Sequence, residues 1–537
     1  MKNGRIGLVL VGAVGIVGMS SVDWEGVARG MRATTTLARV AADYKWSLRK
    51  GAFGESQDYT QTDEYSQTRS LVHKRSAEKL LDLFRKNGGI YVKLGQHIAS
   101  LVYLLPVEYT ETMTVLQDKC DPSSIGEVKQ LVLQDTGRSI GELFERFEEN
   151  PMGVASLAQV HRAFIRIDGQ SVCVAVKIQH PRLDRDASSD IRLCSFFVRL
   201  IKRIFPDFEF DWLAQELQSS LPRELDFDQE HCNAEKARRN FAGSGLVTIP
   251  TVHWSQRRIL VMDFIDGCRI DNCEFIDSHG ISRESVSQRL TKAYSEMIFK
   301  HGFVHCDPHP GNLMLKPIKC PSINNPIGWL RWFLRAVLFR TNFELVLLDH
   351  GLYRQLSDEF RLQYARFWRA IMESDEKTIQ DSAYRLFLHS NNRRKSRDGI
   401  EYHRLFASMV SGRPWEVISS KSTGGIKTLR SRRETQLIQT NAGTNRFLLA
   451  MADILASIPT ELLLLLKTND LLRSVDASLG VASASTANHM TRMVSMMGVY
   501  CADAIYASEK RDGFMKLVAM QFEYWRIVLP LMILQLN

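Results

Sequence analysis

The sequence predicts an α+β fold with two lobes, a small lobe built on a sheet and a larger lobe that is mostly helical. Short alternating runs rich in β-branched residues gather between residues 158 and 263, which is typical of strands. Apolar residues at three- and four-residue steps precede this region and dominate after residue 282, which indicates helices. A chain of 537 residues is long enough for both lobes and for flanking helical segments.

The composition is that of an ordinary globular protein, with 45% hydrophobic and 24% charged residues. The net charge of +9 suits an anionic membrane surface or a phosphate ligand. No zinc-knuckle spacing and no basic-aromatic repeat accompanies that charge, so we expect no nucleic-acid partner. The nine cysteines are scattered without a CxxC pair, which indicates a reduced chain rather than a disulfide framework.

Residues 1–65 are interpreted as a targeting, anchor and linker region. Lys2 and Arg5 precede an apolar, glycine-rich run at 6–19, and further basic residues follow it. The run is shorter than the ~20 residues that span a bilayer as a helix. We therefore favour import into the mitochondrion and association with its inner membrane, with the run either cleaved or retained as an anchor. The alternative is a buried N-terminal helix.

Residues 66–150 are expected to form an N-terminal helical extension, in which Pro106 breaks the helical pattern. The small lobe is assigned to 151–267, and the dipeptide Asp168-Gly169 predicts a tight turn between its first two strands. In chain order, the elements expected there are strands at 158–167 and 172–178, helices at 184–205 and 212–239, and strands at 248–253 and 258–263.

The large lobe is assigned to 268–480 and is expected to be helical from Ser282 onward, interrupted by a strand at 343–349. An insert at 316–342 contains the aromatic and basic run 329–340, in which two arginines fall on one helical face. This run suits a helix in a membrane interface, or equally an insert helix packed on the large lobe. Residues 481–537 are expected to form a helical C-terminal tail.

The strongest chemical signal lies between residues 302 and 351. His305–Asn312 has the His-x-Asp-x-x-x-x-Asn spacing of a kinase catalytic loop, and Asp349-His350-Gly351 ends an apolar strand. A carboxylate and an amide oxygen can hold the divalent cation that bridges nucleotide phosphates, so we predict that Asn312 and Asp349 bind Mg²⁺. Asp307 is predicted to orient or deprotonate the acceptor hydroxyl as a catalytic residue.

Lys177 ends an alternating strand, where a kinase lysine neutralises the α- and β-phosphates of ATP or ADP. We expect Glu230 to be its ion-pair partner, which makes both residues part of the catalytic set. The run 260–267 is typical of a strand that enters an adenine-binding hinge. The other predicted nucleotide-binding residues are Gly153, Ala155, Ser156 and Ala158 of the preceding loop and the backbone of Asp263 and Ile265 in that hinge.

Three departures from ordinary protein kinases accompany these matches. No Gly-x-Gly-x-x-Gly precedes Lys177, so the nucleotide loop is stiffer and carries side chains near the phosphates. Cys306 stands where kinases usually have the arginine that pairs with a phosphorylated activation loop, and a thiol cannot form that bond. No Ala-Pro-Glu follows Asp349. Peptide phosphorylation switched by an activation loop is therefore not expected.

With these motifs, the chain resembles the UbiB/ADCK group of atypical kinases, also called aarF domain-containing kinases, from about Ser70 to Gly480. The group's Lys-x-Gly-Gln motif is present at 93–96, its alanine-rich loop at 155–159 and its Glu-x-Asp motif at 224–226. Details at 303–307 and 466–472 resemble the mitochondrial type-one branch. The resemblance implies a protein-kinase-like fold and a regulatory lid over the active site, made by Lys93, Gly95, Gln96, Glu224 and Asp226.

The resemblance also implies ATP hydrolysis or phosphorylation of a small or lipid-like molecule. Its setting would be mitochondrial lipid or quinone homeostasis and maintenance of the inner membrane and its cristae. The expected partners would be the mitochondrial membrane surface and membrane proteins. Two alternatives remain open. One is a nucleotide-binding scaffold that supports mitochondrial membrane organisation without turnover, and the other is a conventional protein kinase.

Overall fold

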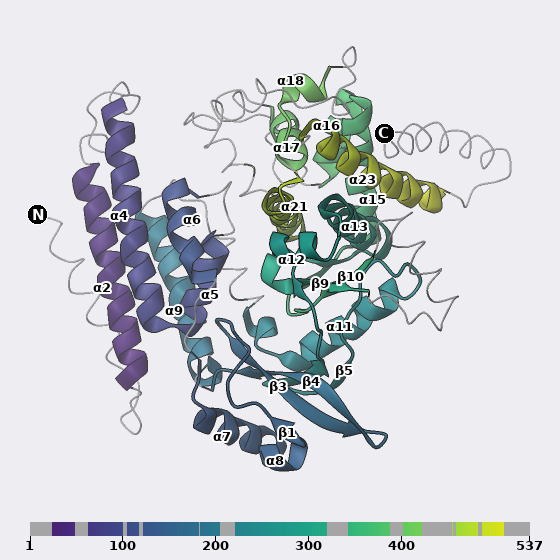
Figure 1. Cartoon of the computed structure of the whole chain (residues 1–537). Coiled ribbons are helices and arrows are strands. Elements are labelled where there is room, and N and C mark those ends of the chain that lie inside the picture. Colours follow the sequence, from purple (N-terminus) through teal and green to yellow (C-terminus); the bar gives the residue numbers. More distant parts are fainter. Residues whose placement is uncertain are drawn as a thin grey trace, which may run out of the picture.

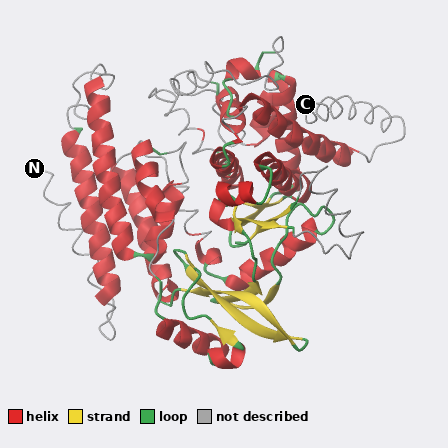
Figure 2. Cartoon of the chain, in the orientation of Figure 1, coloured by secondary structure: helices red, strands yellow, loops and turns green. Residues whose placement is uncertain are grey.

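The computed structural model describes residues 24–48, 63–99, 105–117, 122–181, 183–204, 218, 221–318, 342–386, 401–420, 454, 458–481 and 486–509. Figure 1 shows a layer of N-terminal helices on one side, a twisted sheet below and a helical lobe beside them. Figure 2 separates the strands of the small lobe from the helices that surround them. The predicted α+β fold with two lobes and an added helical segment is confirmed.

Long N-terminal helices form one layer and share a hydrophobic core with a helix of the small-lobe region. Pro106, the expected helix breaker, is the N-cap of the short helix that begins at Val107. The lid motif at 93–96 lies on the helix that begins at Gly89, and this helix packs against the two short helices that follow it. In chain order the elements are α2 (Trp24–Ser47), α4 (Asp63–Asn87), α5 (Gly89–Ala99), α6 (Val107–Met113), the 3₁₀ helix η2 (Thr114–Gln117) and α9 (Leu183–Ile204).

The small lobe is built on an antiparallel sheet of order β1-β3-β4-β6-β5, with β2 paired to β3. Asp168 and Gly169 form the predicted turn between β3 and β4, and both have positive φ, 48° and 80°. One face of the sheet is covered by α7 and α8, and the other by α11. The elements are α7 (Ile125–Thr136), α8 (Ile140–Leu143), β1 (Arg146–Phe147), β2 (Gly153–Val154), β3 (Ala158–Ile167), β4 (Gln170–Gln179), α11 (Phe227–Phe241), β5 (Val252–Gln256) and β6 (Ile259–Asp263).

The strand expected at 248–253 begins later, at Val252. Pro250 has no N–H for a sheet ladder, which explains the delayed start. Thr248 instead forms an isolated parallel bridge with Val346 of the large lobe. The segment before β5 therefore ties the two lobes together.

The large lobe packs its helices around two small sheets, β10-β9-β7 and β11-β8. The expectation of a single strand after Ser282 was incomplete, because three short strands of three to five residues accompany β10. The elements are β7 (Cys268–Arg269), α12 (Cys273–Ser278), α13 (Arg283–Ser295), the π-helix η3 (Glu296–His301), β8 (Phe303–His305), the 3₁₀ helix η4 (Pro310–Asn312), β9 (Leu313–Pro317), β10 (Phe343–Leu347), β11 (Tyr353–Gln355), α15 (Asp358–Glu373), α16 (Glu376–Leu386), α17 (Tyr402–Ser411), α18 (Trp415–Ile418), α21 (Thr460–Ser478) and α23 (Thr486–Glu509).

The run 329–340, with its expected interfacial or packed helix, lies outside the described residues, as do residues 1–23 and 510–537. Among the helices that the structure describes, none is both long and apolar enough to cross a membrane.

Candidate active site

Lys177 lies where strand β4 faces helix α11. Its Nζ donates to both carboxylate oxygens of Glu230, at 2.8 and 2.9 Å. The same ammonium lies 3.4 Å from Oδ2 of Asp349. Burial alone would lower the pKa of Lys177, but the Asp349 and Glu230 carboxylates outweigh it and raise that pKa. The predicted contact between Lys177 and Glu230 is thus present, and the lysine is charged, with Asp349 beside it.

The Glu-x-Asp motif explains how Glu230 reaches this position. Asp226 is the N-cap of α11 and accepts hydrogen bonds from the backbone N–H groups of Asp228 and Gln229. The helix that it starts carries Glu230 one turn later, and Phe227 lies under the lysine with its ring centroid 5.0 Å from Nζ. Glu230 also accepts from the backbone N–H of His350 at 3.3 Å. One carboxylate therefore holds the lysine and links the two lobes.

Asp307 lies between its own loop and a distant helix. The side-chain amide of Asn312 donates to the Asp307 carbonyl oxygen at 3.1 Å and to its Oδ2 at 3.3 Å. Lys467, on α21, donates to Oδ1 at 3.4 Å. Burial acts to raise the pKa of Asp307, but Lys467, Lys93 and two nearby histidines outweigh it and hold the pKa below its usual range. Asp307 is therefore a carboxylate at neutral pH.

Asp349 is held by backbone contacts on both sides. Its Oδ1 accepts from the Gly351 N–H at 2.9 Å, and its carbonyl oxygen meets His305 Nε2 at 2.9 Å. The other ring nitrogen of His305 meets the hydroxyl of Tyr294 at 2.9 Å. Burial opposes ionisation, but chiefly Lys177 lowers the pKa of Asp349 to about 2. The buried histidine of the catalytic loop thus positions the Asp-x-Gly turn rather than facing a substrate.

The donor set fits a hard divalent cation. The side-chain nitrogen of Asn312 donates to Asp307, so the side-chain oxygen of Asn312 points away from Asp307. Asp349 is ionised, and 41% of its side chain is exposed. Carboxylate and amide oxygens are the ligands that Mg²⁺ prefers. Asn312 and Asp349 therefore offer ligand atoms of the right kind, and their role as metal ligands stays a prediction.

The nucleotide loop forms a tight turn between β2 and β3. The N–H of Ala155 donates to the Ala158 carbonyl at 2.8 Å, and the Ala155 carbonyl meets His180 Nε2 at 2.9 Å. Two residues before Ala155, Gly153 pairs with Val160 in the sheet. At the hinge, the N–H of Asp263 donates to the Thr251 carbonyl at 2.9 Å, so an adenine contact by this residue would use its carbonyl oxygen. The predicted roles of these loop residues and of Asp263 and Ile265 in nucleotide binding stay predictions.

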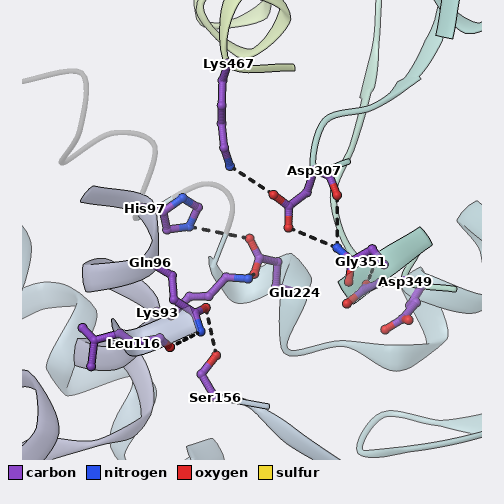
Figure 3. A network of polar contacts seen from close by, with 12 residues as sticks. Lys93, Gln96, His97, Leu116, Ser156, Glu224, Asp307, Asp349, Gly351 and Lys467 are labelled. Atoms are coloured by element: carbon purple, nitrogen blue, oxygen red, sulfur yellow. Dashed lines mark hydrogen bonds and ion pairs between the residues drawn. The ribbon is translucent and has the colours of Figure 1, made fainter. Parts of the chain in front are cut away.

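The lid motif lies on the buried helix α5 and contacts the site from the N-terminal layer (Figure 3). Lys93 Nζ lies 2.7 Å from Glu224 Oε2, with 19% and 5% of the two side chains exposed. The hydroxyl of Ser156 in the nucleotide loop donates to Gln96 Oε1 at 3.2 Å, and Gln96 in turn donates to the Leu116 carbonyl at 3.0 Å. The lid is thus bonded directly to the nucleotide loop and to the Glu-x-Asp motif.

Gly95 explains why the lid helix packs so closely. A Cβ at this position would overlap Leu116 Cδ1 and lie 2.9 Å from Phe84 Cδ2. Only glycine therefore allows α5 to approach η2 and α4 at this distance. In the Lys-x-Gly-Gln motif, Gly95 thus provides the close packing, and Lys93 and Gln96 on either side of it form the polar contacts.

Two residues of this network were not among the predicted site residues. His97, one turn after Lys93, has its Nε2 3.9 Å from Glu224 Oε1, and burial together with Lys467 and Lys93 holds its pKa well below the usual value. Lys467 contacts Asp307 from 160 residues away in the chain. Two signals for Lys467 were available, a single charge directly after the five leucines at 462–466 and its place in the family detail at 466–472.

A separate pocket lies within the large lobe between α13, α15, α17, α21 and α23. Its lining includes Tyr294, Trp368, Asn469 and Arg473 but none of the predicted catalytic or metal-binding residues. It is therefore distinct from the site between the lobes.

Comparison of the sequence with known proteins shows the family of the chain. The profile of the ABC1 atypical kinase-like domain matches residues 115–383. The chain belongs to this family. It is 40% identical over 466 residues to AarF domain-containing protein kinase 1 of Xenopus laevis, covering 86% of this chain and 81% of that protein. It is also 36% identical over 510 residues to the ABC1 family protein MCP2 homolog of Schizosaccharomyces pombe, covering 94% and 84% of the two chains.

Among solved structures, the complex of Rv3197 with erythromycin from Mycobacterium tuberculosis aligns with a TM-score of 0.47 and 18% sequence identity. The alignment covers 80% of this chain and 99% of that one. Within the ABC1 family assignment, the predicted relation to the aarF domain-containing group is confirmed by the sequence relatives.

Proposed function

We propose that this ABC1-family chain is an atypical kinase or ATPase that binds ATP with Mg²⁺ and transfers the γ-phosphoryl group to a small or lipid-like acceptor, or to water. The observation that carries the proposal is the buried Lys177–Glu230 pair beside Asp349, together with Asp307 tethered by Asn312. This arrangement has a cation for the nucleotide phosphates, oxygen ligands for a metal and a carboxylate for the acceptor.

In the proposed reaction, Lys177 binds the α- and β-phosphates while Glu230 holds it in place. Asp307 accepts a hydrogen bond from the acceptor hydroxyl and orients its oxygen toward the γ-phosphorus. That oxygen forms the new P–O bond as the bond between the γ-phosphorus and its bridging oxygen breaks. ADP leaves with the bridging oxygen, and the hydroxyl proton passes to Asp307 or to solvent water.

Asn312 and Asp349 would hold Mg²⁺, which neutralises charge on the phosphate oxygens when bound. The buried His305 keeps the Asp349 turn in place through the Asp349 carbonyl. The contacts with Ser156 and Glu224 hold helix α5 against the nucleotide loop and the Glu-x-Asp motif, which supports its proposed role as a lid against extended peptides. They therefore favour a small or lipid-like acceptor over a conventional peptide substrate.

The test measures nucleotide binding and turnover by the full chain. We expect ADP and ATP to bind more tightly with Mg²⁺ than without it, and Asp349→Asn to abolish that difference. Asp307→Asn should keep nucleotide affinity while lowering turnover. A wild-type chain that binds neither nucleotide, by calorimetry or by thermal shift, would refute the proposal.

A nucleotide-binding scaffold is a second candidate, because the lid is closed on the site through both Lys93 and Gln96. It predicts that cells lacking the protein are rescued by Asp307→Asn and by Asp349→Asn as well as by the wild type. Rescue by Lys177→Ala would further remove any need for nucleotide. The enzyme reading predicts failure of all three variants at equal protein level.

We also propose that the protein works at a mitochondrial membrane surface, in lipid or quinone homeostasis and in upkeep of the inner membrane and its cristae. The N-terminal basic and apolar sequence supports import. Helix α2 is packed on α4 and α9, with an ion pair between Arg29 and Asp190, so a segment removed on import would end before Trp24. A truncated form beginning near Trp24 in isolated mitochondria is the expected result if the segment is cleaved.

The surface of α2 supports contact with lipid. It exposes Trp24, Met31 and Trp46 to 76%, 61% and 73%, whereas the neighbouring α4 exposes mainly charged residues. Tryptophan at both ends of an apolar face suits a bilayer interface. We expect serine at these three positions to reduce flotation with liposomes that contain anionic lipid. Serine at Leu133 and Met152, exposed apolar residues of the small lobe, is the matched control.

A further inference from the structure

A lysine from the distal part of the large lobe reaches the predicted catalytic aspartate. Lys467 lies on α21, beyond the residues 115–383 that the family profile matches. Its Nζ lies 3.4 Å from Asp307 Oδ1, and only 8% of its side chain is exposed (Figure 3). The contact joins a C-terminal helix of the lobe to the centre of the site.

Burial of the Lys467 ammonium lowers the stability of the fold, so we expect the charge to serve a function. Lys467 follows five leucines on α21, of which Leu462, Leu463, Leu464 and Leu465 are buried. Taking an ammonium out of water is unfavourable unless a partner compensates it, and a leucine or methionine would fill the same space without that cost. The carboxylate of Asp307 is the partner that the structure shows.

Helix α21 is fixed strongly enough to position a side chain. The hydroxyl of Ser287 donates to Asp476 Oδ1 at 2.6 Å, and Asn469 donates to the Tyr364 hydroxyl at 3.4 Å. Arg473 donates to the Val410 carbonyl at 2.7 Å. These bonds tie α21 to α13, α15 and α17, so the lysine projects from a rigid support.

With Lys467 in place, both oxygens of the Asp307 carboxylate are bonded. Asn312 binds Oδ2 at 3.3 Å, and Lys467 binds Oδ1 at 3.4 Å. The last torsion of an aspartate is broad, so one bond alone leaves the carboxylate free to turn. Two bonds from opposite sides define its plane. That plane decides where the acceptor hydroxyl is held relative to the γ-phosphorus, and misplacement by about 1 Å can cost about 100-fold in rate.

We propose that Lys467 is a positioning residue of the transfer reaction, which holds the Asp307 carboxylate in the plane that orients the acceptor hydroxyl. The inference rests on the proposed kinase or ATPase activity and adds α21 to the catalytic unit. It assigns a function to a residue that the catalytic-loop spacing could not reveal.

The experiment compares five variants of the full chain with the wild type. Lys467→Met removes the charge and keeps the length of the side chain, and Lys467→Arg restores the charge. Lys300→Met is the matched control, because Lys300 forms a 2.7 Å pair with the buried Glu296 in the same lobe without contacting Asp307. Asp307→Asn, alone and combined with Lys467→Met, completes a double-mutant cycle. Melting temperature, MgATP affinity, kcat and KM for ATP are measured for each.

We expect Lys467→Met to lower kcat by about 10- to 100-fold, as loss of one charge-assisted hydrogen bond predicts. MgATP affinity and KM for ATP should change by less than threefold, because the lysine contacts the acceptor-side carboxylate. Arginine should recover part of kcat, and Lys300→Met should leave it unchanged. Lys467→Met should add no further loss when Asp307 is already asparagine, because the lysine acts through that carboxylate.

Unchanged kcat in a folded Lys467→Met protein would overturn the proposal, as would an equal further loss in the Asp307→Asn background. A parallel fall in melting temperature and MgATP affinity without recovery by arginine would assign Lys467 a structural role instead. Failure of the proposed function looks different, since the wild type itself would then neither bind nor hydrolyse ATP. In that event the inference falls together with the activity on which it rests, whatever the effect of Lys467→Met.

Discussion

Replacing Glu224 by glutamine tests whether one buried ion pair closes the lid. Glutamine keeps the size of the side chain but removes the charge that meets Lys93 at 2.7 Å. Removing one partner of a buried pair costs about 3–5 kcal/mol, because the other charge stays buried without compensation. Here the loss lies at the lower end of that range, since Asp307 and Asp349 also attract Lys93. A cost of about 3 kcal/mol corresponds to roughly a 100-fold rise in lid opening.

Hydrogen exchange measured peptide by peptide gives the readout. We expect the amides of α5 to lose about 100-fold in protection while those of α11 in the small lobe keep theirs. The control is Asp82→Asn, which breaks the Lys86–Asp82 pair of the same 2.7 Å length with 60% and 63% of the side chains exposed. An exposed pair contributes about 1 kcal/mol or less, so this variant should leave α5 unchanged. Equal protection of α5 in Glu224→Gln and wild type would refute the idea that this pair closes the lid.

Three further outcomes follow from the same contacts. Lys177→Met should weaken MgATP binding by at least 30-fold, since loss of one buried charged partner costs about 2–5 kcal/mol, and calorimetry checks it. Gly95→Ala should destabilise the fold by about 1–3 kcal/mol through overpacking, whereas Gly126→Ala on α7, where an added Cβ meets nothing within 4 Å, should not lower the melting temperature. Burial lowers the pKa of His73 to about 4, below its value of about 6.5 in an unfolded chain, so the unfolded state binds the proton more readily. The contribution of the neutral His73 to the stability of the N-terminal layer should therefore be fully present above pH 6.5 and be lost as the pH falls toward 4. The melting temperature of His73→Gln should fall less over this range. A wild-type melting temperature that stays flat between pH 6.5 and 4 would contradict this reasoning.

The pattern of strands and motifs in the sequence was sufficient to predict those parts of the site that are formed by residues close together in the chain. Lys177 at the end of an alternating strand, Asp307 and Asn312 in one loop and Asp349 after a buried strand are each defined by near neighbours in the chain. The turn at Asp168-Gly169 was predictable for the same reason, since its positive φ values depend on two adjacent residues. Short strands such as β8 and β11 were missed because three residues carry too little periodicity to be recognised.

What the sequence determined by itself was the two-lobed fold class, the residues with kinase-type chemistry and the family that they indicate. Only the tertiary structure decided which distant groups complete the site. The bond from Ser156 to Gln96 and the pair between Lys467 and Asp307 join residues 60 and 160 positions apart. Such contacts arise from how helices pack against each other, and packing depends on the shape of the whole core rather than on local spacing. For that reason a single lysine after five leucines could not be assigned to Asp307 until α21 was placed beside the catalytic loop.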